Sequence, residues 1–166
     1  MLIAIAVVAG CGQPATPGDA GTGAGETAPA TLTDADKASI REQTDKFVEA
    51  FNAGDFDTMM TLYTEDGVLM PPNNPAVTGR EAIKAFISTM PKVKDFSITT
   101  DEIEGAGDRA IAYGTFALTF VMPDGTEMAD HGKFIEVREK QADGSWLMTH
   151  DMFNSDMPME GPTPAN

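Results

Sequence analysis

The spacing of apolar residues divides the chain into a helical first half and a strand-rich second half. Apolar residues recur at helical spacing over 40–51, after an N-terminal cap at Thr33, and Gly54 ends this long helix. A short second helix follows a cap at Asp55, and a third begins at Arg80. The pattern therefore predicts three helices before the chain changes its period.

The second half alternates with the two-residue period of strands. A short strand at Val68-Leu69-Met70, after a turn at Glu65-Asp66-Gly67, comes between the second and third helices. The longer strands are expected at Asp95–Ile103, Arg109–Val121, Glu127–Lys140 and Trp146–Asn154. Short turns join the last three into an antiparallel meander. Helices that precede a sheet in this way predict an α+β domain with the helices on one face.

Apolar residues occupy both faces of the predicted strands. In Arg109–Val121 the odd positions include Ile111 and Tyr113, while the even positions include Phe116 and Leu118. A sheet with one solvated face would alternate with polar residues instead. Either the sheet curls around an internal cavity, or a second copy of the chain covers its outer face, and both arrangements are compatible. We expect a homodimer.

The first thirty residues predict export and a membrane tether. An apolar run over 2–9 has the length of a signal-peptide core and ends in Val8-Ala9-Gly10-Cys11, which resembles the lipobox of bacterial lipoproteins. Residues 1–11 are thus expected to be a signal peptide ending at a lipidated Cys11, and 12–30 a flexible tether rich in Gly, Pro, Ala and Thr. In lipoproteins, an Asp directly after the lipidated Cys marks retention in the inner membrane. Here that position is Gly12, so in a Gram-negative organism the protein is expected in the outer membrane. Residues 31–158 form the expected domain and 159–166 a disordered tail.

Composition excludes several kinds of function. The 11 basic and 26 acidic residues give a net charge of −15, which excludes a nucleic-acid-binding face. The single cysteine excludes an intramolecular disulfide. No nucleotide-binding, flavin, nicotinamide or zinc motif stands in the sequence, so we expect no cofactor. Met148, His150 and Met152 share a strand face, but parallel side chains about 7 Å apart do not form a copper site, so no metal is expected.

Several short motifs follow one another in the order of a known family. They are Phe51-Asn52-Ala53-Gly54-Asp55, Tyr63-Thr64-Glu65-Asp66-Gly67-Val68-Leu69-Met70-Pro71-Pro72, Gly79-Arg80-Glu81-Ala82-Ile83, Gly132-Lys133-Phe134, Asp143-Gly144-Ser145-Trp146 and His150-Asp151-Met152-Phe153-Asn154-Ser155-Asp156. Over residues 36–157 the chain resembles the SnoaL-like, ketosteroid-isomerase-like branch of the nuclear transport factor 2-like superfamily. The resemblance implies a cone-like (cystatin-like) fold, with three N-terminal helices on a curved, mostly antiparallel sheet. It also implies a pocket at the open end and a homodimer, but no single chemistry.

His150 is the first candidate catalytic residue. Alternation places it on the face of Trp146 and Met148, together with Asn154, so this row is expected to line the pocket. An imidazole there could act as a general base. The alternative is a buried, hydrogen-bonded histidine. A bulge between Trp146 and His150 would invert the assignment and turn Asp151 inward.

Tyr63 and Asp66 are the other catalytic candidates, since they stand where the second helix leads into the first strand. The resemblance implies acid–base work by a tyrosine and carboxylates inside the cone, although Asp66-Gly67 is also an ordinary turn pair. Met59 and Phe116 complete the expected ligand-binding set.

These observations predict an envelope lipoprotein whose pocket binds a small apolar or amphipathic molecule. One alternative is an acid–base enzyme using His150 with Tyr63 or Asp66, as a cofactor-independent isomerase, dehydratase or hydrolase. Another is a non-catalytic envelope interaction module, whose pocket would be filled by side chains.

Overall fold

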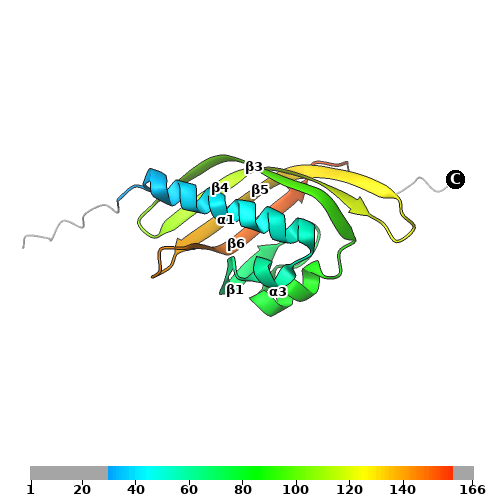
Figure 1. Ribbon diagram of the computed structural model, residues 1–166, viewed down its shortest axis with the longest axis horizontal. Helices are drawn as coiled ribbons and strands as arrows, with labels where there is room; N and C mark the ends of the chain where they lie inside the picture. The colour runs from blue at the N-terminus through cyan, green and yellow to red at the C-terminus, as the bar shows by residue number, and fades with distance from the viewer. Residues whose placement is uncertain (1–29, 159–166) are drawn as a thin grey trace, which may run out of the picture.

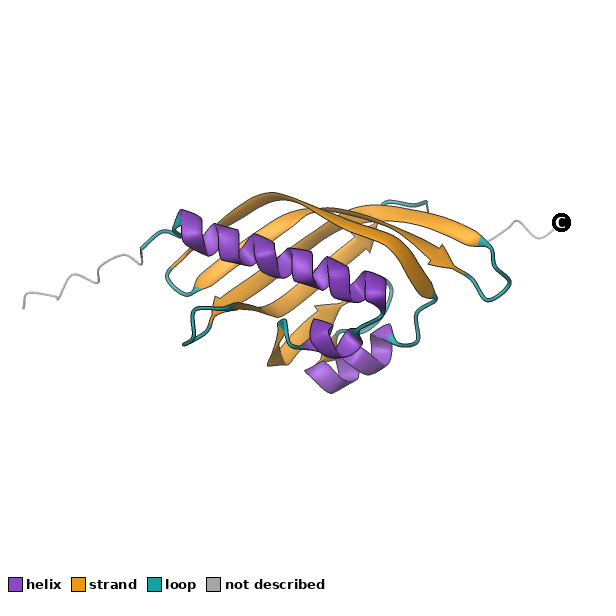
Figure 2. Cartoon of the chain, viewed as in Figure 1, coloured by secondary structure: helices purple, strands orange, loops and turns teal. Residues whose placement is uncertain are grey.

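The computed structural model describes residues 30–158 and has the α+β architecture that the sequence predicts. The long helix α1 (Asp34–Ala53) lies along the concave face of a curved sheet, as Figure 1 shows. The shorter helices α2 (Phe56–Met60) and α3 (Arg80–Ile87) lie together near the C-terminal end of α1 (Figure 2). All three helices thus cover one face, and the described helices include none long and apolar enough to cross a membrane.

α1 begins and ends at the signals that predict it. Thr33 Oγ1 accepts a hydrogen bond from the Asp36 backbone N–H at 3.1 Å, and the Asp36 carboxylate accepts one from the Thr33 N–H. This reciprocal capping box satisfies backbone donors that the helix leaves free. At the other end, Gly54 takes the left-handed conformation with φ 69°. The buried side of α1 includes Thr44, whose hydroxyl accepts a hydrogen bond from Arg138, and Phe47, which packs toward the inner face of the sheet.

The strands form one six-stranded sheet in the order β2-β1-β6-β5-β4-β3. Their bounds are β1 (Tyr63–Met70), β2 (Val77–Thr78), β3 (Lys92–Ala106), β4 (Arg109–Val121), β5 (Glu127–Lys140) and β6 (Trp146–Ser155). β1 and β6 pair in parallel, and the other neighbours are antiparallel. The expected meander of β4, β5 and β6 is therefore present, and the first strand of the chain lies beside the last.

β1 is longer than its sequence pattern predicts. The strand starts at Tyr63, and the expected turn at Glu65-Asp66-Gly67 lies within it. Its pairing with β6 passes from Tyr63 directly to Val68, while β6 advances by only two residues, so the intervening part of β1 bulges. The turn-forming residues produce an irregular strand rather than a chain reversal, because pairing with β6 continues on both sides of them.

β6 contains a bulge that determines which of its side chains point into the molecule. Arg138 of β5 is opposite Met148, whereas the preceding Val137 is opposite His150, so Thr149 has no partner in the ladder. The Thr149 hydroxyl instead donates to the Val137 carbonyl at 3.1 Å. An extra residue in one strand reverses the face to which all later side chains point.

Two glycines allow neighbouring strands to lie unusually close. A Cβ on Gly114 would stand 2.0 Å from the Thr99 carbonyl oxygen, and one on Gly132 would stand 2.0 Å from the Asn154 carbonyl oxygen. No other residue type fits at these positions without a shift of backbone.

The outer face of the sheet carries the second apolar surface that the strand pattern predicts. Tyr113, Ile135 and Met152 follow one another across β4, β5 and β6, and each is at least 40% exposed. Ile111 lies in the neighbouring row and is 36% exposed. We call Ile111, Tyr113, Ile135 and Met152 the outer apolar row.

Candidate functional site

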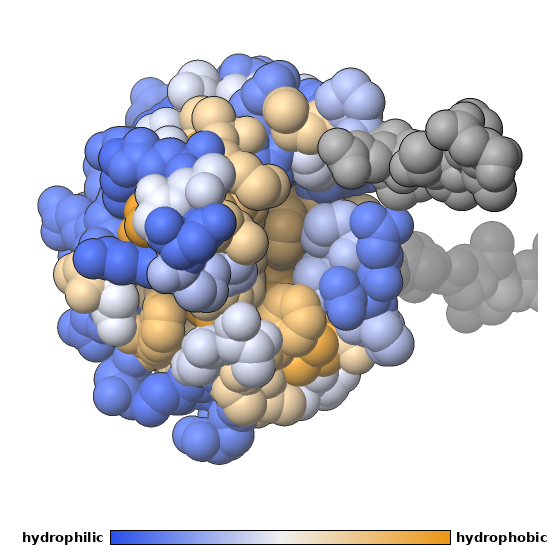
Figure 3. All heavy atoms as spheres, turned by 90° about the vertical axis from the view of Figure 1, so that its right-hand side faces the viewer, coloured by the Kyte–Doolittle hydropathy of each residue, from blue (hydrophilic) through white to orange (hydrophobic). Residues whose placement is uncertain are grey.

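A pocket lies between the three helices and the inner face of the sheet, and its free volume is about 80 Å³. Its wall is largely aromatic, with eight aromatic side chains that include Phe47, Phe116, Phe134 and Phe153. α2 contributes Met59. Figure 3, which looks onto one end of the molecule, shows apolar residues gathered around a central hollow, with hydrophilic residues over much of the surrounding surface. The lining suits the apolar part of a small molecule.

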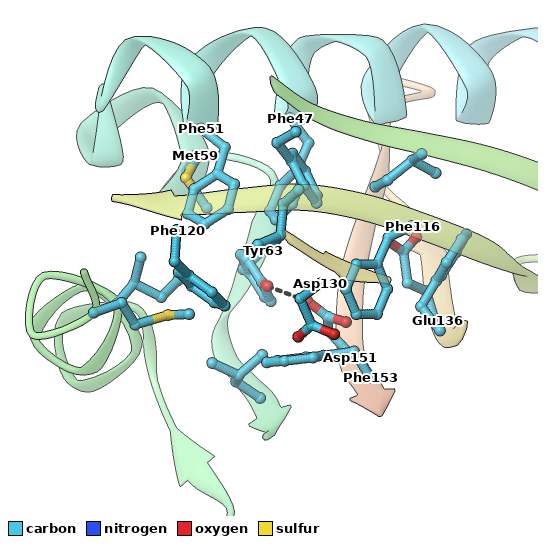
Figure 4. A pocket seen from close by; sticks show the side chains of 17 residues that line it. Phe47, Phe51, Met59, Tyr63, Phe116, Phe120, Asp130, Glu136, Asp151 and Phe153 are labelled. Carbon is cyan, nitrogen blue, oxygen red and sulfur yellow. Dashed lines mark hydrogen bonds between the residues drawn. The ribbon is translucent and has the colours of Figure 1, made fainter. Parts of the chain in front are cut away.

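A tyrosine and an aspartate form the polar part of the wall. The Tyr63 hydroxyl donates to Asp151 Oδ2 at 2.5 Å, as the dashed line in Figure 4 marks. Burial, followed by the charge of Glu136, raises the pKa of Asp151 to about 7, whereas the Tyr63 hydrogen bond and the charge of Arg138 act to lower it. Burial also raises the pKa of Tyr63 well above its usual value, so the phenol remains a donor. Near neutral pH, Asp151 can therefore both hold and release a proton.

A buried ion pair stands beside Asp151. Glu136 is directly opposite Asp151 in the β5–β6 ladder, and both side chains point into the molecule. Arg138 Nε donates to Glu136 Oε2 at 2.8 Å, and its Nη2 lies 2.6 Å from the same oxygen. Nη2 also donates to Thr44 Oγ1 of α1 at 3.2 Å. The guanidinium is thus directed to Glu136, which leaves Asp151 without a cation of its own.

A third carboxylate, Asp130, lines the pocket nearer the start of β5. Its Oδ1 accepts a hydrogen bond from Ser155 Oγ of β6 at 2.6 Å. Figure 4 shows the side chains of Asp130, Glu136 and Asp151 around the same pocket. All the polar side chains of the lining are thus acidic or phenolic.

The prediction that His150 lines the pocket and Asp151 faces away is wrong. His150 is exposed, and its Nδ1 lies 3.1 Å from Thr149 Oγ1. Asp151, only 7% exposed, takes the inward position instead. The cause is the bulge at Thr149, which reverses the alternation that Trp146 and Met148 begin. Asn154, beyond the bulge, is exposed for the same reason, so its predicted place in the pocket is also wrong.

The other predicted residues divide between the pocket and the core. Tyr63, Met59 and Phe116 line the pocket as expected. Trp146 and Met148 are fully buried but lie behind the lining, in the packed core, so neither is positioned to touch a ligand.

Asp66 lies outside the site. Its side chain is exposed on the irregular part of β1 and does not line the pocket, so its predicted catalytic position is wrong. The buried positions of β1 are Tyr63, Gly67 and Leu69, so Asp66, which has the opposite parity, lies on the solvent side.

Sequence reasoning missed Asp130, Glu136 and Arg138, although one signal was available. On β5 these residues share the parity of Phe134, and that even set is the buried one. Charged residues at every second position of a strand that also carries a core phenylalanine point to the same face as that phenylalanine. They therefore indicate a polar site within the core.

The described residues contain no group of three or more His, Cys, Asp or Glu side chains placed to hold a metal ion. Cys11, the tether over 12–30 and the tail over 159–166 lie outside the described residues, apart from residue 30 itself.

Comparisons with known proteins agree with this architecture. The family model of the SnoaL-like domain matches residues 44–147. No functionally curated protein matches the sequence.

Solved structures share the fold at low sequence identity. A ketosteroid isomerase-like protein from Erwinia carotovora atroseptica is similar with a TM-score of 0.68 and 23% identity, covering 76% of this chain and 100% of that one. An NTF2-like superfamily protein from Salmonella enterica has a TM-score of 0.66 and 18% identity, covering 81% and 100%. A protein of cystatin-like fold from Nostoc punctiforme has a TM-score of 0.62 and 19% identity, covering 78% and 97%. At these identities the likeness shows the fold alone.

Proposed function

We propose that this chain, which belongs to the family of SnoaL-like domains, binds a small and largely apolar molecule in the pocket between its helices and sheet. The observation that carries the proposal is a free volume of about 80 Å³ walled by aromatic side chains, with the Tyr63–Asp151 hydrogen bond at its edge. Apolar walls with a few convergent polar groups are typical of ligand sites. An open pocket also argues against an interaction module whose cone is filled by side chains.

Filling the pocket tests this proposal. Leu118 lines the pocket from β4, whereas the preceding residue, Ala117, points outward. Leu118→Phe should therefore abolish binding of a neutral aromatic probe such as phenylethanol, measured by calorimetry, while Ala117→Phe leaves the affinity unchanged. Equal binding by both variants and the wild type would place the probe elsewhere.

A second function is favoured by the pKa of Asp151. A carboxylate with a pKa of about 7 inside an apolar pocket can accept a proton from a carbon acid at neutral pH. In such a step the C–H bond of a bound ketone breaks, the proton moves to Asp151, and the electron pair passes into the carbonyl as an enolate. Asp151 would replace His150 in the predicted acid–base role, with Tyr63 as its positioning partner.

Exchange of a ketone's α-hydrogens for deuterium in heavy water, followed by NMR, tests this chemistry. The wild-type protein should accelerate the exchange in a small cyclic ketone, and Asp151→Asn should lose on the order of 100-fold or more of that acceleration. An equally active Asp151→Asn variant would contradict the role.

The predicted location is part of the proposed function. The apolar run over 2–9 and the lipobox cysteine, Cys11, support a lipid anchor, and the tether over 12–30 has an expected root-mean-square reach of about 25 Å. The domain would then stand just off the surface of an envelope membrane and meet ligands there.

The outer apolar row supports a homodimer. Tyr113, Ile135 and Met152 are adjacent across three strands and exposed in a single copy. A second copy packed on this face would bury them. The inner pocket would remain accessible, since it lies on the opposite face of the sheet.

A further inference from the structure

We propose that the ligand of this pocket carries a protonated amine, which lies between Asp151 and Glu136 while its apolar body contacts the phenylalanines. The inference rests on the proposed binding function and assigns the charge of the ligand. It follows from three features of the described residues: two free carboxylate oxygens, the balance of charge around them, and the aromatic wall.

The first feature is a pair of carboxylate oxygens without partners. Asp151 uses Oδ2 to accept from Tyr63, and Glu136 uses Oε2 to accept from Arg138. Neither Asp151 Oδ1 nor Glu136 Oε1 accepts a hydrogen bond from any residue in the described range, although Asp151 is only 7% and Glu136 only 3% exposed. Residues opposite each other on antiparallel strands have Cβ atoms roughly 5 Å apart. Both carboxylates line the pocket, so an ammonium group that lies between the two side chains can donate to the free oxygen of each.

The second feature is an excess of negative charge. The pocket lining contains Asp130, Glu136 and Asp151 but no Lys, Arg or His. The groups facing Asp151 are Tyr63 from β1 and Glu136 with its Arg138 from β5, while α1 adds no charged group to the lining. A single guanidinium thus faces two adjacent carboxylates and bonds only one of them. A cation supplies the missing charge, whereas an anionic ligand would meet repulsion.

The third feature is the aromatic wall. Phenylalanine faces attract a nearby cation and also bury the apolar body of a ligand. Phe116 of β4 and Phe153 of β6 pack edge to face with ring centroids 6.0 Å apart, and β6 also carries Asp151. The net charge of −15 would in addition raise the local concentration of cations around the molecule.

Three probes of nearly equal shape test the inference: phenylethylamine, phenylethanol and phenylacetate. Calorimetry at about pH 8 should show the amine binding about tenfold more tightly than the alcohol, and the acid most weakly. Because the amine pairs with ionised Asp151, whose pKa in the free protein is about 7, its affinity should rise about tenfold from about pH 6 to pH 8. The affinity of the alcohol should not rise over this range.

Two matched variants locate the effect. Asp151→Asn should reduce the amine's affinity to that of the alcohol, whereas Asp66→Asn, which removes the same charge from an exposed position, should preserve the preference. An equal loss in both variants would overturn the proposed position of the amine, since it would indicate a general effect of surface charge.

A measurement on the wild type keeps the test independent of how the variants fold. At pH 7, amine binding should release about half a proton per site, measured in buffers of different ionisation enthalpy. Absence of proton release would overturn the inference. If the alcohol binds and the amine binds no better, the inference fails while the proposed function stands. If none of the three probes binds, the proposed function fails as well.

Discussion

At the scale of single residues, the site places a carboxylate where it reduces stability. Asp151 is almost fully buried, its one described hydrogen-bond donor is Tyr63, and the nearest guanidinium bonds Glu136 instead. Ionising Asp151 in the folded protein therefore costs free energy that ionising it in the unfolded chain does not. Such a cost is typical of residues retained for function rather than for stability.

The pH dependence of stability should reveal this cost. The pKa of Asp151 is about 7 in the folded protein, against 3.8 for an unperturbed aspartate, so between these values the folded state binds the extra proton. The contribution of protonated Asp151 to the free energy of unfolding is therefore fully present below about pH 4. This contribution is lost as the pH rises to about 7. Asp151→Asn should increase the free energy of unfolding by on the order of 2 kcal/mol at about pH 8 and change it little near pH 4.

Denaturant titrations of both proteins at the two pH values measure this difference. Asp66→Asn is the control, because its exposed side chain should change stability by less than about 0.5 kcal/mol. A destabilised Asp151→Asn protein at about pH 8 would contradict the cost assigned to the buried charge.

At the scale of elements, the irregularities of the strands build the site. The extra residue Thr149 turns Asp151 inward, where Tyr63, opposite Met148 just before the bulge in β1, donates a hydrogen bond to it. The close approach at Gly114 and Gly132 brings backbones of adjacent strands together. Bulges and glycines of this kind bend a sheet and aim side chains, which a regular ladder cannot do.

Gly114→Ala tests the close approach of β3 and β4. The added Cβ would stand 2.0 Å from the Thr99 carbonyl oxygen and 3.0 Å from the Asp101 nitrogen, and both are backbone atoms that move only with the strand. We expect a loss of more than about 2 kcal/mol in the free energy of unfolding. Gly125→Ala is the control: it has φ 84° but no atom within 4 Å of the new Cβ, so it should cost only about 1 kcal/mol. Equal losses in the two variants would contradict the steric argument.

At the scale of the whole molecule, the two faces of the sheet have different proposed roles. The inner face carries the pocket, and the outer apolar row is the proposed dimer interface. Light scattering of a protein lacking residues 1–30 should give the mass of a dimer at micromolar concentration. Ile135→Glu, at the centre of the row, should give a monomer because it would bury a charge at the interface, whereas Met128→Glu on the same strand should remain dimeric. A wild-type monomer would contradict the proposal.

The lipid anchor is the second prediction at this scale. In a bacterial host, the wild-type protein should sediment with membranes and carry the mass of acyl chains. Cys11→Ala should move the domain to the soluble fraction. A soluble, unacylated wild-type protein would show that the predicted location is wrong.

The sequence by itself determined the fold class and most of the elements. Helical spacing, caps such as Thr33 and Gly54, and alternating strands are local signals, and each depends on residues close together in the chain. The sequence also indicated Met59, Tyr63 and Phe116 as pocket residues, Tyr63 through the family resemblance, and all three line the pocket. Local signals also predicted the meander, because strands joined by a short turn pair with each other in antiparallel orientation.

Only the tertiary structure decided which polar residues form the site. A bulge is a property of a pair of strands: whether Thr149 is paired or extra depends on Arg138 and Val137 across the ladder, not on its own neighbours in sequence. One unpaired residue was enough to exchange His150 for Asp151 in the pocket. Side chains along a strand alternate between its two faces. A prediction that misses one extra residue therefore places every later side chain on the wrong face.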